Sequence, residues 1–485
     1  MKNKIHSVKY NFIMNFALTA SQFLFPLITF PYVSRVLQAA GNGKIEFVAS
    51  VANYFLMVAS LGIPTYGVRA CAQTRDDKDE LSKTVHEIFF INLFMTLLVM
   101  LSYFSCLLFV PKFQTEKILF YINAVNIVLN MFGMNWLYQA LEQYDYITFR
   151  SLAFKVISIA LMFLLVHQQE DYVIYAAITV FAAAGSNVLN FIRARHFVNF
   201  KRYGNYEIRK HLKPIFILFA QSLAVSIYTN LDTVMLGYNK TDTDVGYYQA
   251  AEKVKSVLLS LVTSLGNVLL PRMSYYAKNK MKNEFHQTML KALNFTAMLS
   301  LPLGIYFSLF ARESMMLLAG KGYMGAISAM QIITIAVIPI GITGVLGIQV
   351  LTAIEKEKYV LYSVIVGAIV DFILNLAFIP PYGAAGAAAA TTIAEFVVLV
   401  VQLFFTENLL KEIKGGFRLH IYVILSLAAV IGSIWLKMCG GLSFFVILVL
   451  SSLIFFIIYG IGLVISREPL VIDVINTVRK KLKKL

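Results

Sequence analysis

The chain contains roughly fourteen runs of mostly apolar residues, each long enough to cross a membrane as a helix, since a hydrocarbon core about 30 Å thick needs about 20 residues. The runs are bounded by charges, proline or glycine. They cover residues 11–34, 44–66, 85–110, 115–141, 147–166, 172–192, 212–236, 245–271, 288–311, 325–352, 358–380, 383–405, 418–437 and 441–465. This pattern predicts an all-α polytopic membrane protein of about 14 transmembrane helices.

The composition excludes an ordinary soluble protein. Of the 485 residues, 59% are hydrophobic and only 14% are charged. A soluble domain has about 25% charged residues, so this chain has too few polar side chains to cover a water-facing surface. Lipid must therefore cover much of it.

The basic residues indicate the orientation. If the N-terminus is cytoplasmic, 32 of the 42 Lys and Arg residues fall in inside segments and eight fall in outside loops. This bias is the one expected of cytoplasmic loops, so both termini are predicted to be cytoplasmic. It also accounts for most of the net charge of +16 without a nucleic-acid partner.

A weak internal repeat indicates two lobes. Ser60-Leu61-Gly62 closes the second run and precedes Arg69, and Ser264-Leu265-Gly266 closes the eighth run and precedes Arg272. Both runs are second helices of a six-helix unit, so the repeat is parallel. We predict an N-terminal lobe at 1–205, a C-terminal lobe at 206–415, and two further helices with a basic tail at 416–485.

Polar residues recur at helical spacing inside several runs. Gln22 lies in such a stripe in the first run and Asn53 in the second. The stripe of the eighth run contains Glu252, Lys253, Ser256, Ser260 and Asn267. Such stripes face away from lipid, and they are explained either by hydrogen bonds between helices or by a wet central cavity.

Charged residues inside the runs need partners or water, because each costs about 2.5–3.5 kcal/mol at a helix centre. They include Lys155, Lys255, Asp232, Asp371 and Glu395, besides Glu252 and Lys253. A salt bridge between Asp232 and Lys253 is a purely structural explanation for that pair. Arg35, Arg69 and Arg272 lie at run ends, where they either meet substrate or snorkel to headgroups.

Catalytic signatures do not appear in the sequence. The seven histidines have no metal-binding spacing, the three cysteines are far apart, and no G-x-S-x-G motif is present. We therefore expect neither an enzyme nor a metal site.

Several segments resemble one known family. They read LGIPTYGVR at 61–69, NLDTVMLG at 230–237, VGYYQAAEK at 245–253 and PYGAAGAAAATTIAE at 381–395. They are similar to the corresponding segments of Wzx-like polysaccharide repeat-unit flippases of the multidrug/oligosaccharidyl-lipid/polysaccharide exporter superfamily. The resemblance implies a MATE-like fold with two six-helix lobes around a central cavity.

The resemblance also implies a function in the bacterial inner membrane. Such a protein exports undecaprenyl-diphosphate-linked oligosaccharide to the outer leaflet by alternating access, for O-antigen, lipopolysaccharide or capsule assembly. Lys253, Lys255, Arg35, Arg69 and Arg272 are then candidates to attract diphosphate or acidic sugars. The implied partners are membrane lipids, a polysaccharide polymerase and a chain-length regulator. No cofactor is expected, apart from a coupling ion, H⁺ or Na⁺.

Two other functions remain open. A cation-coupled multidrug antiporter of the same fold would use carboxylates such as Asp232, Asp371 and Glu395, with Glu252 as a further candidate. An integral-membrane polysaccharide polymerase would ordinarily carry a sizeable external loop, and the outside loops of this chain are short.

Overall fold

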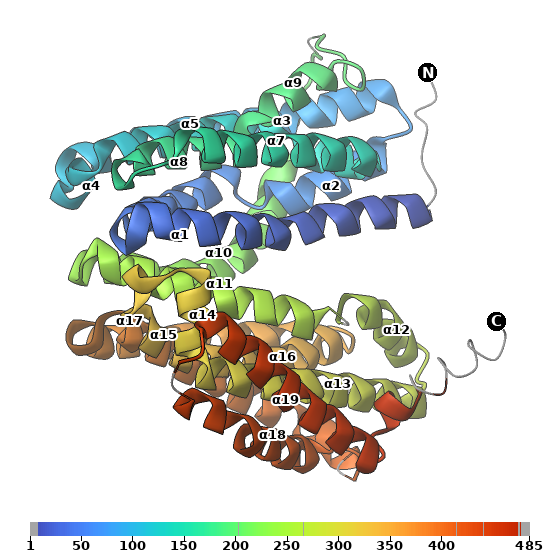
Figure 1. Ribbon diagram of the computed structural model, residues 1–485. Coiled ribbons are helices and arrows are strands. Elements are labelled where there is room, and N and C mark those ends of the chain that lie inside the picture. The colour runs from blue at the N-terminus through green and yellow to red at the C-terminus, as the bar shows by residue number, and fades with distance from the viewer. Residues whose placement is uncertain are drawn as a thin grey trace, which may run out of the picture. The chain divides into compact units, whose positions relative to one another are not determined.

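The computed structural model describes residues 8–201, 203–264, 266–413, 415–439, 441–473 and 476, and every regular element in these ranges is a helix (Figure 1). The chain forms two compact units, Met1–Gly246 and Tyr247–Leu485. The all-helical fold class is confirmed. The division at 205/206 and 415/416 stays a prediction.

The first unit contains ten helices and the start of an eleventh among its described residues. They are α1 (Val8–Ser60), α2 (Ile63–Thr74), α3 (Lys78–Phe109), α4 (Pro111–Thr115), α5 (Lys117–Gly133), α6 (Asn135–Ala140), α7 (Tyr144–Leu165), α8 (Tyr172–Val180), α9 (Asn187–Ala194), α10 (Ile208–Asn239) and α11 (Asp242–Thr263). A 3₁₀ turn, η1 (Gln169–Asp171), precedes α8, and a π-helical turn, η2 (Phe181–Gly185), follows it.

The second unit contains most of α11 and the helices that follow. They are α12 (Gly266–Lys278), α13 (Lys282–Leu309), α14 (Ala311–Leu318), α15 (Ala326–Ile333), α16 (Val337–Thr343), α17 (Glu357–Glu412), α18 (Leu419–Ile434) and α19 (Phe444–Ile465). Short 3₁₀ and π segments connect some of them: η3 (Lys321–Tyr323), η4 (Thr334–Ala336), η5 (Gly344–Leu351) and η6 (Trp435–Met438).

Two of these helices each contain two of the expected spans. α1 is interrupted at Gln38, where φ is 57°, and α17 is interrupted at Gly383, where φ is 54° and ψ is −129°. A glycine suits the second break because this backbone conformation is strained for residues with a Cβ. The chain reverses at Gly383, and the two halves of α17 then pack against each other.

The expected spans coincide with helices. Within the described residues, ten helical stretches are long and apolar enough to cross a membrane, and those containing α1 and α17 account for two expected spans each. The two remaining spans, 212–236 and 245–271, lie on α10 and on α11 with α12. The chain is therefore a multi-pass membrane protein.

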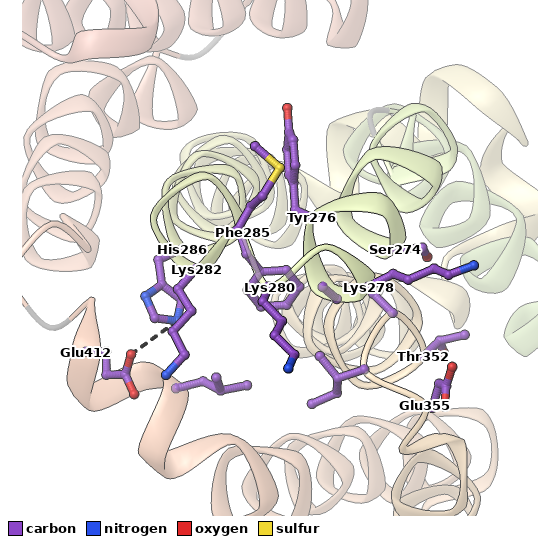
Figure 2. Close-up of a pocket in the computed structure, with 15 residues that line it drawn as sticks. Ser274, Tyr276, Lys278, Lys280, Lys282, Phe285, His286, Thr352, Glu355 and Glu412 are labelled. Atoms are coloured by element: carbon purple, nitrogen blue, oxygen red, sulfur yellow. Dashed lines mark ion pairs between the residues drawn. The ribbon is translucent and has the colours of Figure 1, made fainter.

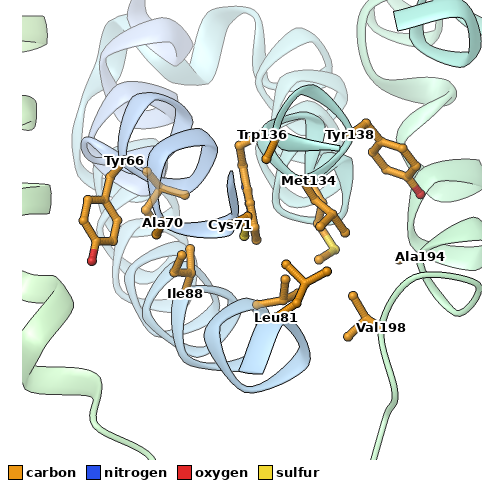
Figure 3. Packing of buried hydrophobic residues seen from close by; sticks show 14 of the residues in the cluster. Tyr66, Ala70, Cys71, Leu81, Ile88, Met134, Trp136, Tyr138, Ala194 and Val198 are labelled. Atoms are coloured by element: carbon orange, nitrogen blue, oxygen red, sulfur yellow. The ribbon is translucent and has the colours of Figure 1, made fainter. Parts of the chain in front are cut away.

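The core of the first unit gathers around α2, α3 and α6 (Figure 3). Trp136 of α6 and Cys71 of α2 are buried there beside Ile88 of α3. Gly62, just before α2, allows α10 to approach closely, because a Cβ there would lie 2.3 Å from the carbonyl oxygen of Ile215. This core holds the break between α1 and α2 against α10.

In the second unit, the last two transmembrane helices pack on α13. The hydroxyl of Tyr306 on α13 lies 2.9 Å from Ser451 Oγ on α19, and Tyr459 on α19 donates a hydrogen bond to the carbonyl oxygen of Met298. Tyr422 of α18 and Phe455 of α19 are fully buried in the same cluster. The final two helices are thus part of the second unit.

Candidate substrate and ion sites

The polar stripe of α11 includes an ion pair inside the helix itself. Lys255 Nζ lies 2.7 Å from Glu252 Oε2, and Ser256 donates a hydrogen bond of 3.4 Å to Glu252 Oε1. Lys255 is buried, whereas Lys253 is half-buried on another side of the helix. Glu252 is therefore paired with Lys255.

Two further residues of this stripe, Ser260 and Asn267, were predicted to line a cavity. Ser260 donates a hydrogen bond of 2.7 Å to the carbonyl oxygen of Val257, so its hydroxyl is satisfied within α11. The side chain of Asn267, also predicted to line a cavity, lies outside the described part of the chain.

Two contacts set the antiparallel register of the halves of α17. Gln402 donates a hydrogen bond of 3.1 Å to Ser363 Oγ, and a Cβ on Gly367 would lie 2.3 Å from Val398 Cγ2. One turn further on, this register brings Asp371 to the level of Glu395.

A buried polar cluster results on α17. Asp371 and Asn375 lie one turn apart and are both completely buried, and Glu395 is 7% exposed. Thr391, one turn from Glu395, lies 3.2 Å by its Oγ1 from the hydroxyl of Tyr248 on α11. The cluster supplies carboxylate, amide and hydroxyl oxygens, which are the groups that hold a proton or a hard cation.

The internal repeat corresponds to a helix break in each unit. α1 ends at Ser60 and α2 begins after Gly62, while α11 ends at Thr263 and α12 begins at Gly266; Leu265 is outside the described residues. Arg69 on α2 and Arg272 on α12 follow these breaks, and both side chains are exposed. The two arginines thus occupy equivalent places in the two units.

Arg69 has a defined environment. Its guanidinium lies 5.4 Å from the ring centroid of Tyr66. It also lines a small cavity of about 290 Å³ together with Lys213 and Pro214 of α10. Two cationic side chains at one cavity form a positively charged entrance, which suits an anionic group.

The remaining predicted residues lie on α1. Arg35 is exposed and donates a hydrogen bond to the carbonyl oxygen of Pro31, just before the kink at Gln38. Gln22 and Asn53 are exposed although they lie within expected spans. Asp232, the candidate on α10, is 3% exposed. The functional roles of all these residues remain predictions.

A buried hydrogen-bond network in the first unit was not predicted from the sequence. His211 of α10 donates from Nε2 to Glu87 Oε2 of α3 over 2.6 Å, and its Nδ1 lies 2.6 Å from the hydroxyl of Tyr66. Glu87 also accepts a hydrogen bond of 2.7 Å from the backbone N–H of Glu207. The one available signal was the polarity of Glu87 near the start of an apolar run.

Lys210 completes this network at its exposed side, with its Nζ 3.3 Å from Glu87 Oε2 and 3.3 Å from Glu207 Oε2. Burial alone would lower the pKa of Lys210. Hydrogen bonds and charge attraction from Glu207 and Glu87 outweigh this effect and raise that pKa above its ordinary value. Lys210 therefore stays protonated at neutral pH.

Lys155, one of the charged residues expected to need a partner inside a run, lies between two parallel helices. Lys155 of α7 donates a hydrogen bond of 2.8 Å to Ser21 Oγ of α1. On the same seam, Thr148 donates to the carbonyl oxygen of Met14 over 2.9 Å. Both contacts join residues 134 positions apart, so α1 and α7 run in parallel with a constant register.

In the described ranges, no group of three or more His, Cys, Asp or Glu side chains is placed to hold a metal ion.

Comparisons with known proteins agree with this architecture. The family described as "Polysaccharide biosynthesis protein" matches residues 8–277, and the MatE family matches residues 218–377. A protein of Escherichia coli K12 named as an O-antigen transporter is 24% identical over 409 residues, which are 84% of this chain and 98% of that protein. A protein of Shigella dysenteriae with the same name is 21% identical over 405 residues, 83% of this chain and 98% of its own length.

Solved structures share the fold. The inward closed conformation of the lipid II flippase MurJ matches with a TM-score of 0.75 at 16% identity, covering 95% of this chain and all of that one. An inward-facing multidrug MATE transporter matches with a TM-score of 0.64 at 13% identity, covering 83% and 99%. The fold is thus that of a multi-pass transporter of the multidrug/oligosaccharidyl-lipid/polysaccharide exporter superfamily.

Within that superfamily, the chain belongs to the polysaccharide biosynthesis protein family, whose match covers more than half of its length. It is a Wzx-like flippase, and the relatives above are transporters and flippases rather than enzymes.

Proposed function

We propose that this protein moves an undecaprenyl-diphosphate-linked oligosaccharide from the inner to the outer leaflet of a bacterial cytoplasmic membrane by alternating access, for O-antigen or capsule assembly. The observation that carries the proposal is the charged stripe of α11, where Glu252, Lys253 and Lys255 lie within an expected span of a family member. The names of the relatives support it.

A polar route is a physical requirement for such a substrate. Each sugar hydroxyl costs about 4–8 kcal/mol to move from water to alkane, so a repeat unit with roughly a dozen hydroxyls would face a barrier of tens of kcal/mol. Polar side chains replace the hydrogen bonds of water while the lipid tail stays in the bilayer. Lys253, Arg69, Arg272 and Arg35 are the proposed contacts for the diphosphate.

The buried oxygens of α17 are proposed to bind the coupling ion, H⁺ or Na⁺. Asp371, Asn375 and Glu395 are buried within the second unit, and Thr391 is hydrogen-bonded to α11 through Tyr248. Protonation or cation binding there would change the charge of the group that α11 packs against. Transport by Asp371→Asn should therefore lose its dependence on an ion gradient, while transport that keeps this dependence would exclude Asp371 from coupling.

Both termini are proposed to face the cytoplasm of the inner membrane, with a polysaccharide polymerase and a chain-length regulator as partners. A cysteine placed at position 480, in a chain whose Cys71, Cys106 and Cys439 are replaced by serine, tests the orientation. An impermeant thiol reagent added to intact cells should leave this cysteine unlabelled and should label a cysteine at position 321. The reverse pattern would overturn the orientation.

Reconstitution tests the transport itself. Purified protein in vesicles should move a fluorescent undecaprenyl-diphosphate oligosaccharide between leaflets, detected as loss of protection from an added quencher.

A multidrug antiporter is the second candidate, favoured by the MatE match and the carboxylates of α17. Gradient-driven efflux of cationic dyes without movement of the lipid-linked sugar would replace the flippase with this alternative.

A further inference from the structure

A cavity of about 760 Å³ opens at one end of the second unit (Figure 2). Its walls come from the connection between α12 and α13, the residues that follow η5, and the last turn of α17. The stretches 282–309, 326–351 and 357–412, each apolar enough to span a membrane, begin or end beside it. The cavity therefore lies at the level where the chain leaves the hydrocarbon core.

Three lysines line this cavity: Lys278 at the end of α12, Lys280 in the connection and Lys282 at the start of α13. All three side chains are exposed, and none makes an ion pair with another described residue. Figure 2 shows Lys280 and Lys282 extending in the same direction. The cavity therefore presents three lysines without ion-pair partners among the described residues at the membrane boundary, where an anionic group could bind them.

The acidic residues of the cavity do not cancel this charge. Glu412 is engaged by His286, whose Nε2 lies 3.3 Å from its Oε2, as the dashed line in Figure 2 shows. Glu355 is the other carboxylate on the wall. The lysines also lie beside the start of α13, whose first turn contains Glu284, so the positive end of the helix dipole is partly offset there and the lysines supply the main positive charge.

The floor of the cavity is apolar. Met281, Phe285, Ile354 and Leu409 line it, and Phe285 is buried in the core of the second unit. A site with lysines on its rim and apolar side chains on its floor matches a molecule with an anionic head and a hydrophobic body. Basic pockets at the cytoplasmic ends of transmembrane helices bind anionic lipid headgroups in this way.

We propose that this cavity binds the phosphate of a membrane lipid headgroup, with Lys280 and Lys282 as the principal contacts. Phosphate of this kind has two sources: an anionic phospholipid of the bilayer, or the diphosphate of the lipid carrier of the sugar. The cavity uses none of the residues assigned above to substrate or coupling ion. Binding there anchors the α12–α13 connection to the membrane surface.

Lipid binding to the purified full-length protein tests the proposal by native mass spectrometry. The probes are dioleoylphosphatidylglycerol, dioleoylphosphatidylcholine with the same tails, undecaprenyl diphosphate and inorganic pyrophosphate. The double variant Lys280→Gln/Lys282→Gln should bind phosphatidylglycerol or undecaprenyl diphosphate about ten-fold more weakly, a loss of about 1.4 kcal/mol, because it removes two solvent-exposed cations from the headgroup. The matched control is Lys321→Gln/Lys358→Gln, which removes two exposed lysines that do not line the cavity.

Further outcomes separate the alternatives. Binding of phosphatidylglycerol assigns the site to bilayer lipid, and binding of undecaprenyl diphosphate alone assigns it to the carrier. Glu355→Gln should strengthen the binding of either lipid, because it removes a negative charge from the cavity wall. The proposal would be overturned if the control variant lost as much lipid affinity as the cavity variant, or if the cavity variant lost none. It would also be overturned if pyrophosphate bound as tightly as the lipids. Because the readout is binding, it does not depend on whether the protein transports sugar.

Discussion

His211 and Glu87 lie 124 positions apart in the sequence and meet at 2.6 Å between Nε2 and Oε2, with neither side chain exposed by more than 3%. The carboxylate has two further donors, Lys210 and the backbone N–H of Glu207, so the beginning of α10 and the residue before it are fastened to α3. Tyr66 extends the contact to α2. Three elements of the first unit are thus joined through one carboxylate.

We expect Glu87→Ala to destabilise the protein by about 3–5 kcal/mol, because it leaves buried donors without an acceptor. Thermal unfolding in detergent measures this with a thiol-reactive fluorophore, since Cys71 is fully buried in the adjoining core. Cys106 and Cys439 would be replaced by serine beforehand. Glu80→Ala, an exposed glutamate on the same helix, is the control, and an equal loss in both variants would contradict the anchoring role.

Gly383→Ala should destabilise the protein by about 1–3 kcal/mol, the cost of a strained backbone conformation, because φ is 54° at the reversal of α17. Gly460→Ala is the matched control. Gly460 lies within α19 with no atom within 4 Å of an added Cβ, so alanine there should be neutral or stabilising by about 0.5–1 kcal/mol. The same thermal assay compares the two, and unchanged stability of Gly383→Ala would refute the strain argument.

Lys253→Ala should abolish display of surface polysaccharide while leaving a folded protein in the membrane, because it removes the cation proposed for the diphosphate. Lys255→Gln combined with Glu252→Gln removes an ion pair as a unit and should retain most display, because no buried charge is left alone. Complementation of a strain lacking its own flippase measures both. Rescue of Lys253→Ala by Asp232→Asn would instead make Lys253 part of a structural salt bridge.

Arg69→Gln and Arg272→Gln should each reduce the rate of sugar-lipid movement several-fold at normal protein abundance. The physical reason is the loss of a charge-assisted contact at the equivalent helix breaks of the two units. Lys78→Gln, which removes an exposed cation at the start of α3, should leave the rate unchanged. Unaltered rates in both arginine variants would favour snorkelling to headgroups as their role.

Much of the architecture was predictable from the sequence. The expected spans 358–380 and 383–405 are the two halves of α17, and the Ser-Leu-Gly segments at 60–62 and 264–266 mark helix breaks. The polar stripe of α11 was also predictable, because its polar residues recur every three or four positions in the sequence. These features are local, so a window of neighbouring residues contains the information that specifies them.

The partners of the polar side chains were much less predictable. Lys155 meets Ser21 across 134 positions, and the basic cavity joins residues near 280 to residues near 355 and 412. Even within α11, the spacing of the stripe did not specify which lysine pairs with Glu252, and the structure pairs it with Lys255.

The sequence by itself determined that this chain is helical and membrane-embedded, because backbone polar groups in lipid must be satisfied within each apolar segment, and a helix does this with local hydrogen bonds. Only the tertiary structure decided which carboxylate meets which base, as for Glu87 with His211. The physical reason is that a charge inside a membrane protein is stabilised by whichever group the packing of distant helices brings within about 3 Å, and a residue's neighbours in the sequence do not specify that group.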